Sequence, residues 1–201
     1  MATRGVPSDW SSSGMDGLDH GYRQRIAAHY QASATAKSRL KYCMFLHYMM
    51  ALLMLAKLVP FILDKFNFFI LAIEELEVPE PLGWEWVWLF GIFSSFFCLN
   101  GIKKNNYTSI KNYICSIIIF GYLPLIYGAV YWFPEAYMFI FHKGDGFRDG
   151  WYDIQLWKGY PYGLLWFAFI IPGFQLHSFT MYFSIALLRA WKPRSLRNKD
   201  D

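Results

Sequence analysis

The sequence predicts an all-α membrane protein, a bundle of four transmembrane helices with both termini in the cytosol. Of its 201 residues, 55% are hydrophobic, 21% are aromatic and only 17% are charged. An ordinary soluble domain carries about a quarter charged residues. A chain this short also leaves much of its surface exposed, so a water-soluble core could not hide so many aromatic rings. Lipid is therefore the expected solvent, and two further patterns, the apolar runs and the placement of charge, support this fold.

Four apolar runs are each long enough to cross a bilayer. A helix rises about 1.5 Å per residue, so about 20 residues cross a hydrocarbon layer of about 30 Å. Backbone groups in lipid must hydrogen-bond within their own segment, so these runs are predicted to be helices and not strands. The expected spans are residues 42–63, 84–102, 113–133 and 163–188, within a membrane domain over 42–191.

The segments outside this domain are expected to be cytosolic. Residues 1–17 are rich in Ser and Gly and predict a flexible tail, and residues 192–201 form a basic tail. The segment 18–41 predicts a basic, weakly amphipathic helix that lies along anionic headgroups, with a solvated helix as the alternative. Its expected contacts with the membrane surface are Arg23, Arg25, Lys37, Arg39 and Lys41. The first apolar run begins near Tyr42, too late for a cleavable signal peptide.

The orientation follows from the distribution of Lys and Arg. Fourteen of them precede the first span, lie between spans two and three, or follow the fourth span, against four in the other two loops. The positive side is cytosolic. The opposite loop 64–80 is acidic and predicts a solvated lumenal loop without a calcium role. The sequon at Asn106 falls in a cytosolic loop, where it is not expected to be glycosylated.

Aromatic and small residues predict how the spans sit and pack. Aromatic side chains near the span ends are expected at the headgroup level: Trp84, Trp86, Trp88, Tyr131, Trp132, Tyr160, Tyr162 and Trp166. Stripes of small residues are expected at helix contacts: Gly91, Ser94, Ser95 and Cys98 in span two, Gly121 and Gly128 in span three, and Gly173, Thr180 and Ser184 in span four. Pro124 and Pro172 are expected to bend spans three and four.

Polar side chains within the spans are candidates for function, because a charge at the bilayer centre costs about 2.5–3.5 kcal/mol. We interpret them as structural. Lys57 is expected to reach the lumenal interface or contact a helix, and His47 to lie near the cytosolic headgroups. His177 lies on the small-residue face of span four, where it can bond a neighbouring helix, and Gln175 points the opposite way.

No set of residues forms a catalytic constellation, so the chain is not expected to be an enzyme or to need a cofactor or metal. Cys43, Cys98 and Cys115 all lie in apolar stretches, and each is interpreted as a buried small hydrophobe. No nucleic-acid partner is expected, and the oligomeric state is not indicated.

The C-terminal tail resembles a dilysine-type retrieval signal, which the coatomer (COPI) reads on membrane proteins of the endoplasmic reticulum. Arg197 and Lys199 lie fifth and third from the end. Two cations at this spacing on an exposed tail can meet an acidic receptor surface. The Arg and the acidic last two residues make the signal a non-standard one.

Several segments in order resemble the Jagunal family, its insect members most closely. They are 19–31, 37–43, 55–58, Ile73–Pro79, Leu123–Tyr127, Trp157–Gly163, Gly173–His177 and Ala190–Lys192, and the match is poorest over 141–153. The resemblance implies a four-span protein of the endoplasmic reticulum membrane, without catalytic activity. It further implies a role in organising that compartment and in vesicle-mediated transport through the early secretory pathway. Family members have been linked to coatomer, which adds weight to the Arg197 and Lys199 tail.

A rival function from another class is a small carrier or channel lined by Lys57, His177 and Gln175. Transporters usually have internal repeats with broken helices at matching positions. Here Pro124 and Pro172 have no counterparts in the first two spans, which favours the non-enzymatic organiser.

Overall fold

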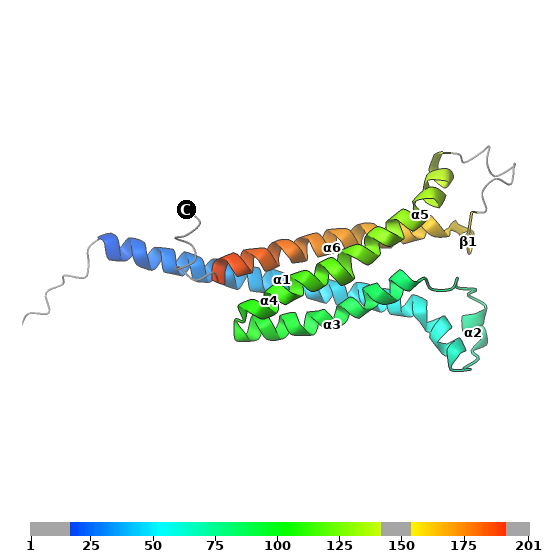
Figure 1. Ribbon diagram of the computed structural model, residues 1–201, viewed down its shortest axis with the longest axis horizontal. Helices are drawn as coiled ribbons and strands as arrows, with labels where there is room; N and C mark the ends of the chain where they lie inside the picture. Colours follow the sequence, from blue (N-terminus) through cyan, green and yellow to red (C-terminus); the bar gives the residue numbers. More distant parts are fainter. Residues whose placement is uncertain (1–16, 142–153, 192–201) are drawn as a thin grey trace, which may run out of the picture.

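The protein is a bundle of long helices. The computed structural model describes residues 17–141 and 154–191, with side chains from residue 23 onward (Figure 1). Within these ranges, four helical segments are long and apolar enough to cross a membrane. They are α1 (Gly17–Lys65), α3 (Gly83–Lys104), the continuous α4 (Tyr107–Ser116), η1 (Ile117–Tyr122) and α5 (Leu123–Phe141), and α6 (Tyr162–Trp191). This agrees with the four expected spans.

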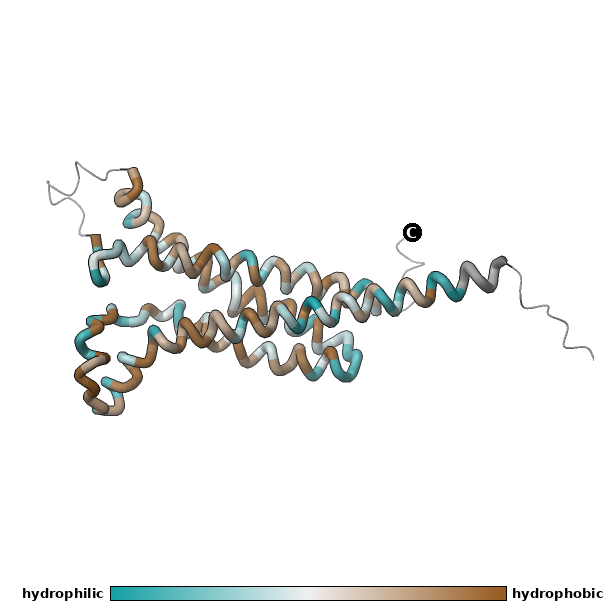
Figure 2. Tube along the Cα trace, turned by 180° about the vertical axis from the view of Figure 1, so that it is seen from behind, coloured by the Kyte–Doolittle hydropathy of each residue, from teal (hydrophilic) through white to brown (hydrophobic). Residues whose placement is uncertain are grey.

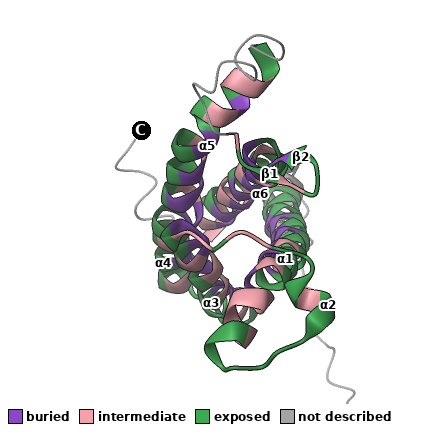
Figure 3. Ribbon diagram, turned by 90° about the vertical axis from the view of Figure 1, so that its right-hand side faces the viewer, coloured by how far each residue is buried: buried purple, intermediate pink, exposed green. Residues whose placement is uncertain are grey.

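The helices form a four-membered bundle with two distinct ends (Figures 1 and 3). One end holds the α3–α4 turn and the C-terminus of α6, and we call it the turn end. The other holds the short α2 (Leu71–Glu74) and a hairpin of β1 (Leu156–Trp157) and β2 (Tyr160–Pro161), and we call it the hairpin end. The helices separate toward the hairpin end, with α5 and α6 on one side and α1 and α3 on the other (Figure 1).

The hairpin is closed by residues in the left-handed region. Lys158 has φ 49° and Gly159 has φ 84°. A two-residue hairpin turn with positive φ at both positions suits the twist of its strands. The turn thus fixes Trp157 opposite Tyr160, two residues before α6 begins.

The expected basic helix over 18–41 is the first half of α1, a helix of 49 residues. It continues straight into the first span and projects beyond the bundle (Figure 1). No Pro or Gly separates the two parts between Tyr22 and Val59, so they share one backbone helix, and contact of the basic part with headgroups stays a prediction. The last turns of the basic segment pack in the bundle together with the first span. They share a line of buried residues at spacings of three and four: Ser33, Ala36, Leu40, Met44, His47, Ala51, Met54 and Leu58.

The outside of the bundle is apolar and its inside holds the polar groups. Phe93, Phe97 and Val130 are 58%, 68% and 69% exposed. His47, Glu85, Ser95, His177, Thr180 and Ser184 are buried. Hydrophobic residues dominate the middle of the helices, while hydrophilic ones gather at the α3–α4 turn and along the start of α1 (Figure 2). This distribution suits a hydrocarbon solvent, in which interior polar groups find partners.

Most of the aromatic residues near the span ends face the core of the bundle. Trp84, Trp88, Trp132 and Trp166 are all buried, and with Tyr162 they belong to the main apolar cluster at the hairpin end. Position along a span predicts the depth of a ring but not which way around the helix it faces, so the headgroup level stays a prediction for these rings. Tyr131 and Tyr160 are exposed.

Proline residues accompany distortions of the helix in span three, and the position of Pro124 predicts a distortion but not its form. The six residues of η1 form a π-helix that ends two residues before Pro124. Proline lacks an N–H and its ring clashes with the carbonyl four residues earlier, and a π-helical turn accommodates both. Pro134 lies inside α5, which continues to Phe141, and the last turns of α5 bend away from α6 (Figure 1). Pro172 lies inside α6 without ending it.

Candidate functional site

The candidate site is the polar interior of the bundle, which has two layers. The first layer surrounds Lys57, toward the hairpin end. The second surrounds His47, ten residues earlier in α1, and lies about 15 Å away because a helix rises about 1.5 Å per residue. Each layer joins several helices through named polar contacts.

The first layer is a buried ion pair between α1 and α3. The Lys57 ammonium lies 2.6 Å from the Glu85 carboxylate, and their side chains are 16% and 1% exposed. Glu85 also accepts a hydrogen bond from the Leu82 backbone N–H at 3.0 Å, at the start of α3. The ammonium lies 5.5 Å from the Trp166 ring centre, so α6 joins the same contact. Lys57 thus makes the expected helix contact, with an anion as its partner.

Glu85 did not stand out in the sequence, because the second span is uncharged only from Trp86 onward and Glu85 precedes that run. A signal was available. An acid in the first turn of a helix is favoured by the helix dipole and can bond free N–H groups. A lone cation in the neighbouring span, at the same end, was its natural partner.

Glu135 was missed as well. Its carboxylate accepts a hydrogen bond from the Gly163 backbone N–H at 2.9 Å, in the first turn of α6. A side chain on Gly163 would approach Glu135 to 3.2 Å. Glu135 therefore links the end of the third span to the start of the fourth and satisfies a free helix N–H.

The second layer is an aromatic and imidazole cluster. The Trp88 indole N–H donates to Nε2 of His177 at 3.1 Å. The rings of His47 and His177 lie edge to face with centres 5.2 Å apart. His47 Nδ1 lies 3.4 Å from the Ser95 hydroxyl. Three spans therefore meet here through ring and hydrogen-bond contacts.

The third span is the remaining one, and it joins this layer through the absence of a side chain. A Cβ on Gly121 of η1 would lie 3.1 Å from the His177 ring. Glycine thus lets the π-helical segment approach the imidazole closely. The prediction that His177 bonds a neighbouring helix agrees with this geometry. The prediction for His47 was wrong: its ring is buried and faces the bundle, so it does not lie among headgroups.

The residues of the rival channel do not converge. Gln175 is exposed on the outer face of α6, opposite the buried His177. His177 meets His47, whereas Lys57 belongs to the other layer. No described contact joins the three, and nothing favours a shared polar path.

Basic residues gather at the turn end. Lys37 donates to the Asn105 side chain and lies over the Trp191 ring at 5.3 Å. Arg39 lies over Phe183 at 5.6 Å. Other cations at this end belong to α1, to the α3–α4 turn and to the end of α6: Lys41, Lys103, Lys104, Lys111 and Arg189. Arg23 and Arg25 lie on the projecting part of α1, and Arg197 and Lys199 lie outside the described residues.

The structure also places the cysteines and Asn106. Cys43 and Cys98 are buried, but Cys115 is exposed on the bundle surface, so the expectation of burial was wrong for that thiol. Among the described residues, no group of three or more His, Cys, Asp or Glu side chains could hold a metal ion. Asn106 caps α4, since its side chain accepts from the N–H groups of Thr108 and Ser109.

The fold and its polar interior define a class: a multi-helix membrane protein whose buried polar groups join its helices. The chain belongs to the Jagunal family, whose sequence model, described as "Jagunal, ER re-organisation during oogenesis", matches residues 1–195. It is similar to Protein jagunal of Drosophila melanogaster, with 45% identity over 199 residues and 99% of each chain covered. Protein jagunal of Drosophila pseudoobscura pseudoobscura is 44% identical over 199 residues, again with 99% of each covered. Protein jagunal homolog 1 of Homo sapiens is 29% identical over 191 residues, covering 95% of this chain and 94% of that one. The family description connects its members with reorganisation of the endoplasmic reticulum, and none of these names carries an enzymatic activity.

Proposed function

We propose that this protein resides in the endoplasmic reticulum membrane and is required for the organisation of that compartment and for vesicle-mediated transport in the early secretory pathway. The observation that carries the proposal is the family match across residues 1–195, whose description names reorganisation of the endoplasmic reticulum. The four apolar helices supply the means of membrane insertion. The polar interior contributes packing and needs no reaction to explain it.

The proposed orientation places the turn end in the cytosol. Support comes from the cations that α1, the α3–α4 turn and α6 bring to this one end. The hairpin end then faces the lumen with the acidic loop between α1 and α3. In this arrangement α1 extends into the cytosol beyond the bundle and brings its basic residues to the side of the cytosolic headgroups and coat proteins.

A cellular replacement experiment tests the function. Cells depleted of their own copy of this protein would be given either the full chain or none, and two quantities would be measured: reticulum morphology and the transit time of a secretory cargo to the Golgi. The full chain is expected to restore both. Normal morphology and transit in the depleted cells would contradict the proposal.

The tail carries the second part of the proposal, that coatomer binds Arg197 and Lys199. The variant Arg197→Ala/Lys199→Ala is expected to lose coatomer from pull-downs and to move in part to the Golgi. A matched control, Lys192→Ala/Arg194→Ala, removes the same charge nearer the membrane and is expected to keep both properties. If the control variant lost coatomer and moved to the Golgi to the same extent, general charge, and not the tail signal, would be responsible. If the tail variant kept both properties, the proposal would be wrong.

A further inference from the structure

A run of large apolar side chains follows α1 at the hairpin end, and we call residues 66–71 the apolar loop. Phe66, Phe68 and Phe69 are 71%, 64% and 76% exposed, and Ile70 and Leu71 are exposed as well. Contiguous exposed apolar surface usually marks an interaction surface. The run lies beyond the end of the first membrane-crossing helix and before the second, so these helices do not account for it.

The apolar loop begins with a turn that bonds its own backbone groups. The Phe68 N–H donates to the Leu63 carbonyl at 2.9 Å, and the Asn67 N–H donates to the Asp64 carbonyl at 2.9 Å. Together with the left-handed Asn67, at φ 56°, these bonds form the Schellman motif that ends α1. At the other end of the loop, α2 donates two of its N–H groups to the Ile70 carbonyl. A segment with its backbone bonded in this way can enter a layer that is poor in water.

The edge of the hydrocarbon at this end lies near the Lys57–Glu85 pair. A layer of about 30 Å corresponds to about 20 helical residues, and counted back from Lys104, the last residue of α3, it ends near Glu85. Because Glu85 contacts Lys57, α1 leaves the hydrocarbon near Lys57. The headgroup layer beyond this edge is about 5–7 Å thick. Pro60 is three residues further along α1, about 4–5 Å away, and so lies within that layer.

The end of α1 then turns sideways. Pro60 lies inside α1, five residues before the helix ends, and a proline inside a helix commonly bends it. The last turns of α1 lead away from the bundle, and the connection after them lies to one side of it (Figures 1 and 3). A straight helix would carry Phe66 about 9 Å past Pro60 and out of the headgroup layer. The bend therefore keeps the apolar loop close to the level of the headgroups.

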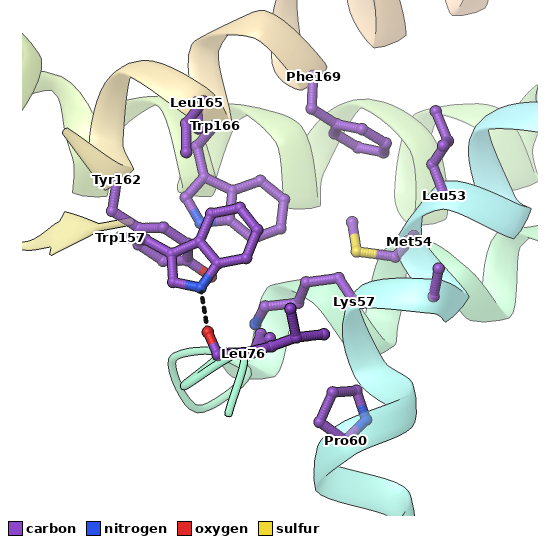
Figure 4. A pocket seen from close by; sticks show the side chains of 12 residues that line it. Leu53, Met54, Lys57, Pro60, Leu76, Trp157, Tyr162, Leu165, Trp166 and Phe169 are labelled. Carbon is purple, nitrogen blue, oxygen red and sulfur yellow. Dashed lines mark hydrogen bonds between the residues drawn. The ribbon is translucent and has the colours of Figure 1, made fainter. Parts of the chain in front are cut away.

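The acidic part of the same connection is held elsewhere. The Trp157 indole N–H donates to the Leu76 backbone carbonyl at 2.9 Å (Figure 4). The Lys158 ammonium donates to the Glu75 carbonyl at 2.8 Å and lies 3.8 Å from the Glu77 carboxylate. These bonds hold the acidic part against the hairpin, whereas the apolar loop lies outward. Segments that separate apolar from charged residues in this way lie in the membrane interface.

Lipid is the occupant that chain continuity favours. Phe66 comes directly after α1, whose outward side chains, such as Leu55, are exposed along the first span. Asp64 and Lys65 lie between them, and the Lys65 ammonium lies 5.1 Å from the Phe61 ring centre. Charged side chains on apolar stems suit the headgroup level. The lipids that surround α1 therefore also border the apolar loop, and no further component is needed to cover it.

We propose that the apolar loop inserts into the leaflet at the hairpin end, with Phe68 and Phe69 below the headgroups and the acidic part in water. The loop is then an interfacial anchor that holds this end of the bundle in its leaflet, the lumenal one in the orientation proposed above. The inference requires only that the helices span a membrane. It does not depend on that orientation or on a role in the secretory pathway.

Spin labels in nanodiscs test the insertion directly. In a Cys115→Ala background, where Cys43 and Cys98 are buried, a nitroxide would be attached to Phe69→Cys or to Glu80→Cys, an exposed position in the acidic part. The full chain, one copy per phosphatidylcholine nanodisc, leaves both membrane faces open to water. Power-saturation EPR would compare access of oxygen with access of a polar nickel complex. The oxygen-to-nickel ratio is expected to be at least about fivefold higher for Phe69→Cys, because the polar complex is excluded from apolar surroundings.

Two further labels make the outcome decisive. Phe97→Cys, exposed on the side of α3, gives the value expected for hydrocarbon, and Leu71→Cys samples the apolar loop a second time. Circular dichroism would check that each variant is folded. If the labels in the apolar loop had the nickel access of Glu80→Cys, the loop would lie in water and the proposal would be wrong. Labels that neither reagent reached would show that the chain itself covers the loop, which would equally overturn it.

Discussion

At the scale of single residues, the Lys57–Glu85 pair is a short ion pair buried within the described bundle. Both charges lie where hydration is poor, and Glu85 is almost fully buried. Removing one partner of such a pair is far more costly than the net value of the pair, because the remaining charge is left without compensation.

Glu85→Gln is expected to destabilise the folded protein by about 3 kcal/mol, since it leaves the Lys57 ammonium facing a neutral amide. Reversible unfolding by SDS in mild-detergent micelles, followed by tryptophan fluorescence, measures this change. Glu80→Gln, at an exposed loop position, is the matched control and should change little. If Lys57→Met combined with Glu85→Gln is no more stable than Glu85→Gln alone, the pair is not the reason for the loss.

In the second layer, Trp88→Phe is expected to cost about 1–3 kcal/mol, because it leaves Nε2 of His177 buried without its donor. The same unfolding measurement applies. Trp86→Phe, at a partly exposed neighbouring position, should be close to neutral. A cycle with His177→Phe then separates the hydrogen bond from packing: Trp88→Phe should cost less in the His177→Phe background. Equal costs in both backgrounds would mean that the hydrogen bond adds nothing.

At this scale, the important residues were easier to predict from the sequence than their partners were. Lys57 and His177 stood out because polar side chains are rare within apolar runs. Glu85 and Glu135 did not, since both lie at the ends of runs where acids are common. His47 could not be placed, because its depth along the helix says nothing about whether it faces lipid or the core.

At the scale of elements, close approach between α3 and α4 depends on Gly101. A Cβ there would lie 2.8 Å from the Ser109 Cβ and 3.3 Å from Cδ1 of Ile110. Such contacts require the turn after α3 to move, whereas at Gly83 nothing lies within 4 Å.

Gly101→Ala is therefore expected to destabilise the bundle by about 1–3 kcal/mol, less a gain in helix propensity of up to about 1 kcal/mol. Gly83→Ala is expected to be neutral or slightly stabilising. Thermal unfolding of both variants in detergent compares them directly. Equal melting temperatures would show that the α3–α4 turn tolerates a side chain and that the close approach is not required.

The helices themselves could be predicted from the sequence, because apolar length is a direct physical requirement of the bilayer. Their continuity was harder. The basic segment up to Lys41 and the first span differ in composition but share one backbone helix, since composition alone does not break a helix. Pro124 predicted a distortion of span three but not its π-helical form, and the close approach of Gly121 to His177 is visible only in the packed bundle.

At the scale of the whole molecule, the distribution of charge relates the bundle to its membrane. The cations at the turn end come from three separated parts of the chain, so the helical arrangement itself creates the charge asymmetry. The aromatic core, by contrast, lies at the hairpin end and closes the space where the helices separate.

This arrangement predicts that the native sequon at Asn106 stays unmodified, because the α3–α4 turn would face the cytosol and the Asn106 side chain caps α4. A glycosidase-sensitive shift in gel mobility would report modification. An engineered Asn-Gly-Thr inserted in the segment 142–153, on the opposite side, should be glycosylated and serves as the positive control. Modification at Asn106 itself would contradict the orientation.

The central claim is that the chain crosses the membrane four times with its positive end in the cytosol, and antibody access to tags on both termini tests it most directly. In cells whose plasma membrane alone is permeabilised, both tags should stain as fully as after complete permeabilisation. If one tag stains only after the internal membranes are opened, the two ends lie on opposite sides, the number of crossings is odd and the account is wrong.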